Sequence, residues 1–389
     1  MKSSAAFNGK RLQIARLFNG MTTTELADTL GVSRQTISDY ETCRAKNPDM
    51  QKIRTMSQAL GFPIDFFLES DSEEVQISQA TYFRSQLTTN KKYRVAQEKK
   101  IELVSRIFAF IAEYVEFPVL NLPEYYGNDP VEAAALLRKF WDLGDRPIDN
   151  LIYIVEQNGI LVTSFDTDIP AIDAFSQKIL VDDTVHFVIA YSKNKNAATR
   201  IHFDVAHELG HMMLHGWDDD VEALDSDDFK AREDEANRFA AAFLLPEQPF
   251  IMDLGMYADR LEYYVNLKKK WKVSIAAMIR RAFSLDQINY NQYQFMMRKM
   301  QKQGIRKQEP LDDVLTTAPP SLLRAAVEML INEEVMTADD FIQELAYEHA
   351  VSLYPATIEE LLGLRKGTLK RNNVIPIHTL NLKNISEDD

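Results

Sequence analysis

Hydrophobic residues recur at helical spacing over most of this chain, and short alternating or apolar runs replace that spacing only in the middle. The helical spacing predicts helices over residues 10–18, 23–30, 34–42, 50–60, 64–69, 84–111 and 132–141. Strands of a small sheet are expected over residues 150–157, 159–162 and 187–191. The pattern therefore predicts a mainly α protein with a small β-sheet, an α+β arrangement.

Polar residues interrupt the apolar flank of a further helix, expected around residues 199–215. His207 and His211 are four residues apart, so both imidazoles project from one helix face, with Glu208 beside them. Burying such groups without partners costs several kcal/mol, whereas binding a metal satisfies them. The spacing H-E-x-x-H is that of zinc peptidases, and it predicts a zinc site.

Catalytic zinc usually has three protein ligands, so a third is needed outside this helix. Residues 232–246 predict a second amphipathic helix, and Glu233 shares its apolar face. Glu235 is expected to point nearly opposite. We therefore predict Glu233 as the third ligand, with Asn237 one turn further on in a supporting position.

The run from Asp173 to Pro246 resembles the ImmA/IrrE family of zinc-dependent peptidases, which pairs H-E-L-G-H with a following E-x-x-A-N-x-F-A-A segment. The resemblance implies a zincin-like fold, metal ligands His207, His211 and Glu233, and Glu208 as the general base. The chain departs from the family pattern at Ser192, where an Asn is common before the helix.

A three-residue turn, Gly31-Val32-Ser33, joins two short amphipathic helices near the N-terminus. Glycine suits the end of one helix and serine the cap of the next, which is the helix-turn-helix arrangement. Side chains suited to base edges and phosphates cluster on and around the second of these helices. The DNA-binding candidates are Ser33, Arg34, Gln35, Thr36, Ser38 and Arg44.

Residues 10–68 resemble the Xre/Cro-type repressor domain, with matches at residues 26–33, 37–41 and 60–61. The resemblance implies binding to operator DNA. Two positions depart from that family: Thr23 replaces a common Gln, and the usual Gly is absent from residues 42–45. An interaction module of the same fold is the alternative, because this fold also mediates protein contacts.

Charge is distributed unevenly between the two parts of the chain. The net charge is −14, yet residues 1–69 carry nine Lys/Arg against seven Asp/Glu. That asymmetry indicates a different partner for the N-terminal segment. The single Cys43 excludes a disulfide framework, and we expect a cytoplasmic protein, because no signal sequence or apolar run of membrane-spanning length is apparent.

Glu208 is expected to deprotonate a water that attacks a peptide carbonyl. Tyr191 and His215 are the candidate donors to the oxyanion, although His215 is alternatively a partner of a metal ligand. Residues 187–191 are predicted either as an edge strand that binds an extended substrate or as an ordinary core strand. The acidic residues between the two metal helices, from Asp218 to Asp228, predict a solvated loop.

Four segments are predicted: a helix-turn-helix domain over 1–70, a linker and long helix over 71–118, a peptidase domain over 119–310 and a helical C-terminal domain over 311–389. The basic run 84–106 is interpreted as a solvated face or as a DNA-backbone or dimerisation surface. Residues 267–281 resemble a helix-turn-helix-like subdomain, whose basic residues suit either packing with exposed charges or DNA.

Two functional hypotheses remain. In the first, a zinc peptidase joined to a DNA-binding module cleaves a repressor, an antitoxin-like protein or itself, and a homodimer binds the operator. In the second, the chain is a non-catalytic regulator or antitoxin whose metal site is structural or senses a ligand.

Overall fold

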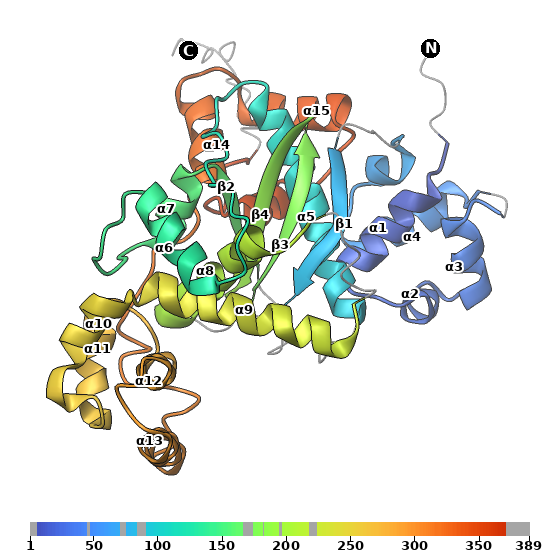
Figure 1. The fold of residues 1–389 in the computed structure, drawn as a ribbon. Helices are drawn as coiled ribbons and strands as arrows, with labels where there is room; N and C mark the ends of the chain where they lie inside the picture. The colour runs from blue at the N-terminus through green and yellow to red at the C-terminus, as the bar shows by residue number, and fades with distance from the viewer. Residues whose placement is uncertain are drawn as a thin grey trace, which may run out of the picture.

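The computed structural model describes residues 6–44, 47–70, 75–83, 91–165, 174–181, 183–193, 197–217 and 224–370. These residues form a mainly helical protein around one small sheet, as predicted (Figure 1). None of the helices within those ranges combines the length and the hydropathy of a membrane span.

The N-terminal helices follow their predicted ranges closely. They are α1 (Gly9–Phe18), α2 (Thr23–Leu30), α3 (Arg34–Glu41) and α4 (Met50–Leu60), with a 3-10 turn over Ile64–Leu68. Gly31 ends α2 with a φ of 64°, and the Ser33 side chain caps α3 by accepting a hydrogen bond from the Thr36 amide. Leu26 and Ile37 are fully buried between the helices, so the helix-turn-helix prediction is confirmed.

Four strands form the sheet in the order β1-β3-β4-β2. Their bounds are β1 (Val75–Phe83), β2 (Ile160–Phe165), β3 (Ala174–Val181) and β4 (Thr184–Ser192). β2 runs parallel to β4, whereas β1 and β4 both pair antiparallel with β3. Since β4 lies between two strands, the prediction of residues 187–191 as a substrate-binding edge is wrong, and they form a core strand.

The structure differs from the predicted strands at two further places. The strand predicted over residues 150–157 is wrong, because Leu151–Gln157 form helix α7. Asn150 caps this helix by accepting a hydrogen bond from the Tyr153 amide, and Leu151 and Val155 are buried one turn apart. β1 was not predicted, and it lies in the segment expected to be a linker.

The sheet separates two hydrophobic cores, and β4 shows why. Val188 and Ala190 face one core, while the alternating Phe187, Ile189 and Tyr191 face the other. Helices α5 (Lys91–Ala112), α14 (Leu322–Asn332), α15 (Ala338–Glu348) and α16 (Pro355–Leu362) contribute to the first core. Helices α6 (Pro130–Phe140), α7, α8 (Ala198–Leu214) and α9 (Ser226–Leu244) contribute to the second.

Polar contacts attach the helix-turn-helix domain to the rest of the protein. Glu69 lies 3.5 Å from Arg11 and accepts a hydrogen bond from the Ser352 amide, 2.8 Å away. At the start of α5, Lys92 pairs with Glu25 of α2 at 2.7 Å, which lowers the pKa of Glu25 to about 2. Lys92, which belongs to the basic run 84–106, thus forms an ion pair within the protein.

A helical subdomain follows α9 and lies at the opposite end of the molecule from α3 (Figure 1). It comprises α10 (Glu247–Leu254), 3-10 turns at Gly255–Tyr257 and Leu261–Tyr263, α11 (Tyr264–Trp271), α12 (Ile275–Ser284) and α13 (Tyr290–Lys302). Lys268 is buried and pairs with Glu309 at 2.8 Å and Asp312 at 2.5 Å. Lys270 pairs with Asp253 at 2.7 Å, so these lysines of the 267–281 segment serve packing.

The acidic segment between α8 and α9 lies partly within the described residues. Asp218, Asp219 and Asp220 lie outside the described residues. Asp225 caps α9 by accepting hydrogen bonds from the Asp227 and Asp228 amides, which gives part of the run a local structural role.

Candidate metal centre

Helices α8 and α9 approach closely because Gly210 carries no side chain. A Cβ atom placed at Gly210 would lie 3.1 Å from the Cα of Ala236, tighter than ordinary contact. Gly210 lies between His207 and His211 in sequence, and Ala236 lies one turn beyond Glu233. The small residue therefore allows the face of α9 that carries Glu233 to reach the histidines.

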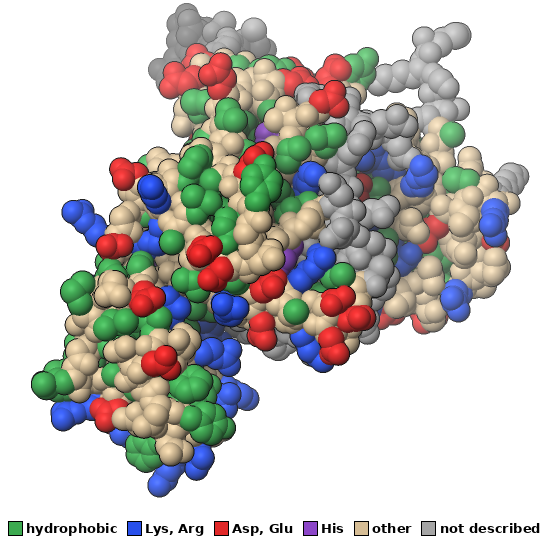
Figure 2. Space-filling view, in the orientation of Figure 1, with side chains coloured by type: hydrophobic (Ala, Val, Ile, Leu, Met, Phe, Trp, Pro, Cys, Tyr) green, Lys and Arg blue, Asp and Glu red, His purple; other side chains and the backbone are tan. Residues whose placement is uncertain are grey.

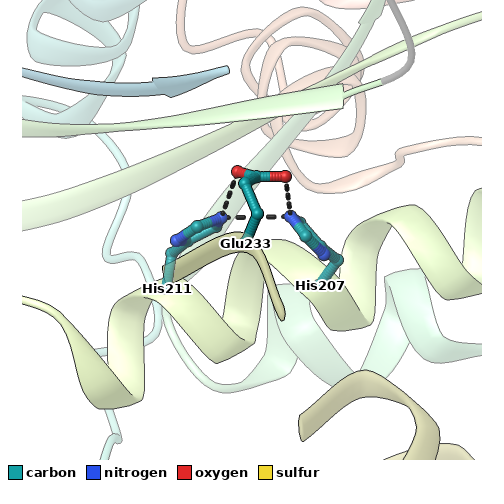
Figure 3. A group of neighbouring side chains, drawn as sticks. All are labelled: His207, His211 and Glu233. Atoms are coloured by element: carbon teal, nitrogen blue, oxygen red, sulfur yellow. Dashed lines mark hydrogen bonds and ion pairs between the residues drawn. The ribbon is translucent and has the colours of Figure 1, made fainter. Parts of the chain in front are cut away.

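His207, His211 and Glu233 converge on one point (Figure 3). The two Nε2 atoms are 3.0 Å apart, and the carboxylate oxygens of Glu233 lie 3.4 Å from His207 Nε2 and 3.3 Å from His211 Nε2. Both histidines are fully buried, and the Glu233 side chain is 14% exposed. The three side chains thus offer two nitrogens and a carboxylate to a shared space.

The donor set suits a zinc ion. Two ligand atoms at about 2.1 Å from a tetrahedral zinc lie roughly 3.4 Å apart, close to the observed separations. Burial lowers the pKa of His211 to about 4, so its ring is neutral at pH 7. Burial alone would raise the pKa of Glu233, but hydrogen bonds to His207 and His211 lower it to about 2. A neutral imidazole and an ionised carboxylate are the forms that bind metal.

Glu208 is fully buried beside this cluster. Its Oε2 accepts a hydrogen bond from the Ser176 hydroxyl of β3, 2.5 Å away. Ser176 was part of the family pattern in the sequence, but no role was predicted for it. Its signal in the sequence is a hydroxyl that directly follows the apolar Ala174 and Phe175 of a predicted family pattern.

His215 does not point into the cluster, which corrects its prediction as an oxyanion donor. The helix ends at Leu214, and His215 is extended, with ψ of 145°. Its Nδ1 lies 2.9 Å from His211 Nδ1, on the side of that ring away from Glu233, and its Nε2 lies 3.0 Å from Glu235. The alternative, in which His215 supports a metal ligand, agrees with this geometry. Glu235, expected to point away, reaches His215.

Tyr191 and Asn237 are also placed differently from their predicted roles. Tyr191 is buried, and its hydroxyl interacts with Ser164 near Glu156 rather than with the cluster; burial raises its pKa to about 12. The Asn237 amide donates to the backbone oxygen of Glu233 at 2.7 Å, so it supports the helix and not the carboxylate.

The predicted DNA-binding side chains lie on one accessible part of the first domain. Ser33, Arg34, Gln35 and Arg44 are exposed, and Thr36 and Ser38 are partly so. Local bonds already engage some of them: the Ser33 hydroxyl caps α3, and Gln35 donates to Asp39 at 2.8 Å. Cys43, after α3, adopts a positive φ of 54°.

Comparison with known proteins gives a family match for each of two regions of the chain. Residues 12–67 match the family described as Helix-turn-helix, and residues 155–283 match the peptidase family described as the IrrE N-terminal-like domain. Over 96 residues the chain is 27% identical to the SPbeta prophage-derived uncharacterized HTH-type transcriptional regulator YonR of Bacillus subtilis (strain 168). That match covers 25% of this chain and 88% of the relative.

The fold and the matches show a helix-turn-helix domain followed by a domain similar to the IrrE-like peptidase family. Residues 12–67 match the Xre-type helix-turn-helix family and residues 155–283 match the IrrE-like peptidase family, the two families that the sequence resembles. The family is generally zinc-dependent, and the cluster at His207 lies within the matched residues.

Proposed function

We propose that the protein is a DNA-binding regulator whose zinc-dependent peptidase domain cleaves a repressor, an antitoxin-like protein or the chain itself, and thereby switches gene expression. The convergence of His207, His211 and Glu233 beside a buried Glu208 carries this proposal. A purely structural zinc site needs no additional carboxylate aligned next to the ligands. The alternative remains a non-catalytic regulator with a structural or ligand-sensing site.

The roles of the residues follow from their contacts. His207, His211 and Glu233 would hold the zinc, which supplies Lewis acidity to polarise a carbonyl and acidify water. Glu208 accepts the proton of the attacking water and later delivers it to the leaving amine. Ser176 holds the Glu208 carboxylate in place, and His215 with Glu235 orients the His211 ring.

We further propose that the peptidase rests in a latent state because β1 occupies the sheet edge next to Glu208. An extended peptide commonly binds a protein by adding to a sheet edge. Here β3 would be that edge, and β1 pairs with it so that Tyr82 lies opposite Ser176 in the register. The pairing is interrupted between Ile77 and Thr81, where the register shifts.

Replacing the general base separates the two hypotheses. Glu208→Gln should keep one zinc per chain and abolish cleavage of a protein encoded beside this one, measured by mass spectrometry after co-expression. The expected loss is on the order of 10²–10⁴-fold. Regulation and fragment patterns that are unchanged in this variant contradict the peptidase proposal, and a chain that binds no metal contradicts the zinc site itself.

The DNA-binding role has its own test. Arg34→Ala and Arg44→Ala should weaken operator binding and reduce its salt dependence by about one unit of slope for each lost phosphate contact. Arg298→Ala, on α13 at the other end of the molecule, is the control. Equal effects of all three variants would exclude α3 as the interface, and the dimer prediction is tested by light scattering of the same complex.

A further inference from the structure

A cavity of about 790 Å³ lies between the metal-bearing helices and the α12–α13 subdomain, and the cluster residues do not line it. Its walls come from α8, α9, α12, α13 and the segment after α13. The charged lining is dominated by arginine: Arg200, Arg238, Arg280, Arg281 and Arg306. Figure 2 shows Lys and Arg side chains gathered where this subdomain meets α9.

These positive charges exceed the negative charges around them. The lining contains five arginines but only two aspartates, Asp204 and Asp234, and neither lysine nor glutamate. Arg238 lies 3.6 Å from Asp129, and Arg200 donates to the Lys307 carbonyl oxygen. Among the described residues, Arg280, Arg281 and Arg306 form no ion pair with a carboxylate.

Arg281 is the most informative of the five. Its side chain is nearly buried, with 6% of the residue exposed, and its Nε donates to the Leu245 carbonyl oxygen at 3.3 Å. Burial lowers the pKa of Arg281. Glu247 offsets part of this cost, but no carboxylate forms an ion pair with Arg281 among the described residues, so a bound anion would further stabilise the buried charge.

The remaining lining indicates the size and character of the anion. Phe203, Met297, Ala241 and Val131 add an apolar wall to the cavity. Its volume falls in the range of small-molecule sites, roughly 300–1,000 Å³, and its shape is concave. A DNA duplex does not enter such a space, and α3 lies at the opposite end of the molecule (Figure 1). The backbone amides of Ile275 and Ala276 are already bonded to Glu309, so arginine supplies the anion-binding groups.

We propose that this cavity binds a small phosphorylated molecule with an apolar ring, of the nucleotide class. Guanidinium groups bind phosphate oxygens with two parallel hydrogen bonds, and an apolar wall suits a base. The occupant contacts α8 and α9, the helices that carry His207, His211 and Glu233. It therefore contacts both helices that position the metal cluster.

Calorimetric titration of the full-length protein with ATP, inorganic triphosphate and adenosine tests the proposal. ATP should bind more tightly than triphosphate, since only ATP uses the apolar wall, and adenosine should bind weakest. The double variant Arg280→Glu/Arg306→Glu should weaken ATP binding at least tenfold. Both residues are exposed and make no recorded ion pair, so the substitutions should leave the fold intact, which circular dichroism checks.

Arg298→Glu is the matched control, because Arg298 is exposed on α13 but does not line the cavity. An equal loss of affinity in this control indicates general charge attraction and overturns the proposal. Failure of both ATP and triphosphate to bind the wild-type protein also overturns it. The proposal is also overturned if the double variant binds a random DNA duplex more weakly than the wild type but binds ATP and triphosphate equally well. The arginines would then bind DNA.

Discussion

The hydroxyl of Ser176 on β3 donates a hydrogen bond to the carboxylate of Glu208 on α8, so the sheet itself fixes the position of the proposed general base. Ser176→Ala removes that donor without touching the metal cluster. We expect unchanged zinc content and a cleavage rate about tenfold lower, because a hydrogen bond to a charged group contributes about 1.5 kcal/mol. Loss of zinc in this variant would contradict the assigned role.

The contact of Glu235 with His215, and of His215 with His211, predicts an effect on metal affinity. Glu235→Gln should weaken zinc binding about 10- to 100-fold, as loss of an outer partner of a metal-binding histidine usually does. Competition with a fluorescent chelator measures this. Asp228→Asn, an exposed carboxylate on the same helix, is the control and should have no effect.

The close approach of the helices at Gly210 predicts that larger side chains at this position lower stability and zinc affinity step by step. Gly210→Ala forces a shift of a few tenths of an ångström against Ala236, and Gly210→Leu forces α8 and α9 apart. We expect stability to fall by about 1–3 kcal/mol, more in the leucine variant, with zinc affinity falling in the same order. Equal zinc affinity in all three proteins would show that the helix spacing does not set the site.

His202 predicts a pH dependence of stability. Burial lowers the pKa of His202 to about 4 from 6.5. The unfolded chain binds this proton at higher pH, so the stabilisation is complete above pH 6.5 and is lost as the pH falls toward 4. Between pH 7 and pH 5 the expected loss is about 2 kcal/mol.

His202→Gln keeps a side chain able to bond Thr317, which lies 2.9 Å from His202 Nε2, but it does not titrate. Urea unfolding with a chelator present, to remove metal effects, should show a smaller difference between the two pH values in the variant. An identical difference in both proteins would exclude His202 as the source.

If β1 blocks the sheet edge in the latent state, a disulfide that holds β1 on β3 should prevent cleavage. Gln76 and Leu180 are partners in the β1–β3 register, so Gln76→Cys/Leu180→Cys in a Cys43→Ser background can fasten β1 to the sheet edge. The oxidised protein should lose cleavage and recover it on reduction. Cleavage that is equal in both redox forms would show that β1 need not leave.

The spacing of hydrophobic residues predicted the features that depend on one helix alone, namely which residues share a helix face. Helical spacing alone predicted that His207 and His211 share one helix face. The apolar positions of α9 predicted that Glu233 lies on the face that packs against the protein. The position of His215 depends on α8 ending at Leu214, which periodicity does not define. The apolar run at Leu151–Val155 suits a strand or a helix, and only the cap at Asn150 distinguishes them.

Long-range pairing could not be predicted in the same way. β1 finds its partner across about a hundred residues, and the alternation of Val75 and Ile77 does not identify β3 as that partner. The contacts of Ser176 and Tyr191 likewise depend on the strand order. The segment boundaries at residues 70, 118 and 310 remain predictions.

The bond between Glu69 and the Ser352 amide joins the first domain to a segment synthesised 283 residues later. During translation the helix-turn-helix domain emerges from the ribosome early, when this anchoring residue does not yet exist. The domain folds around its own buried Leu26 and Ile37, and Lys92 of α5 can pair with Glu25 soon afterwards, whereas the Glu69 contact forms only after Ser352 has been synthesised. A nascent chain therefore holds its helix-turn-helix domain through α5 first and gains the Glu69 contact later.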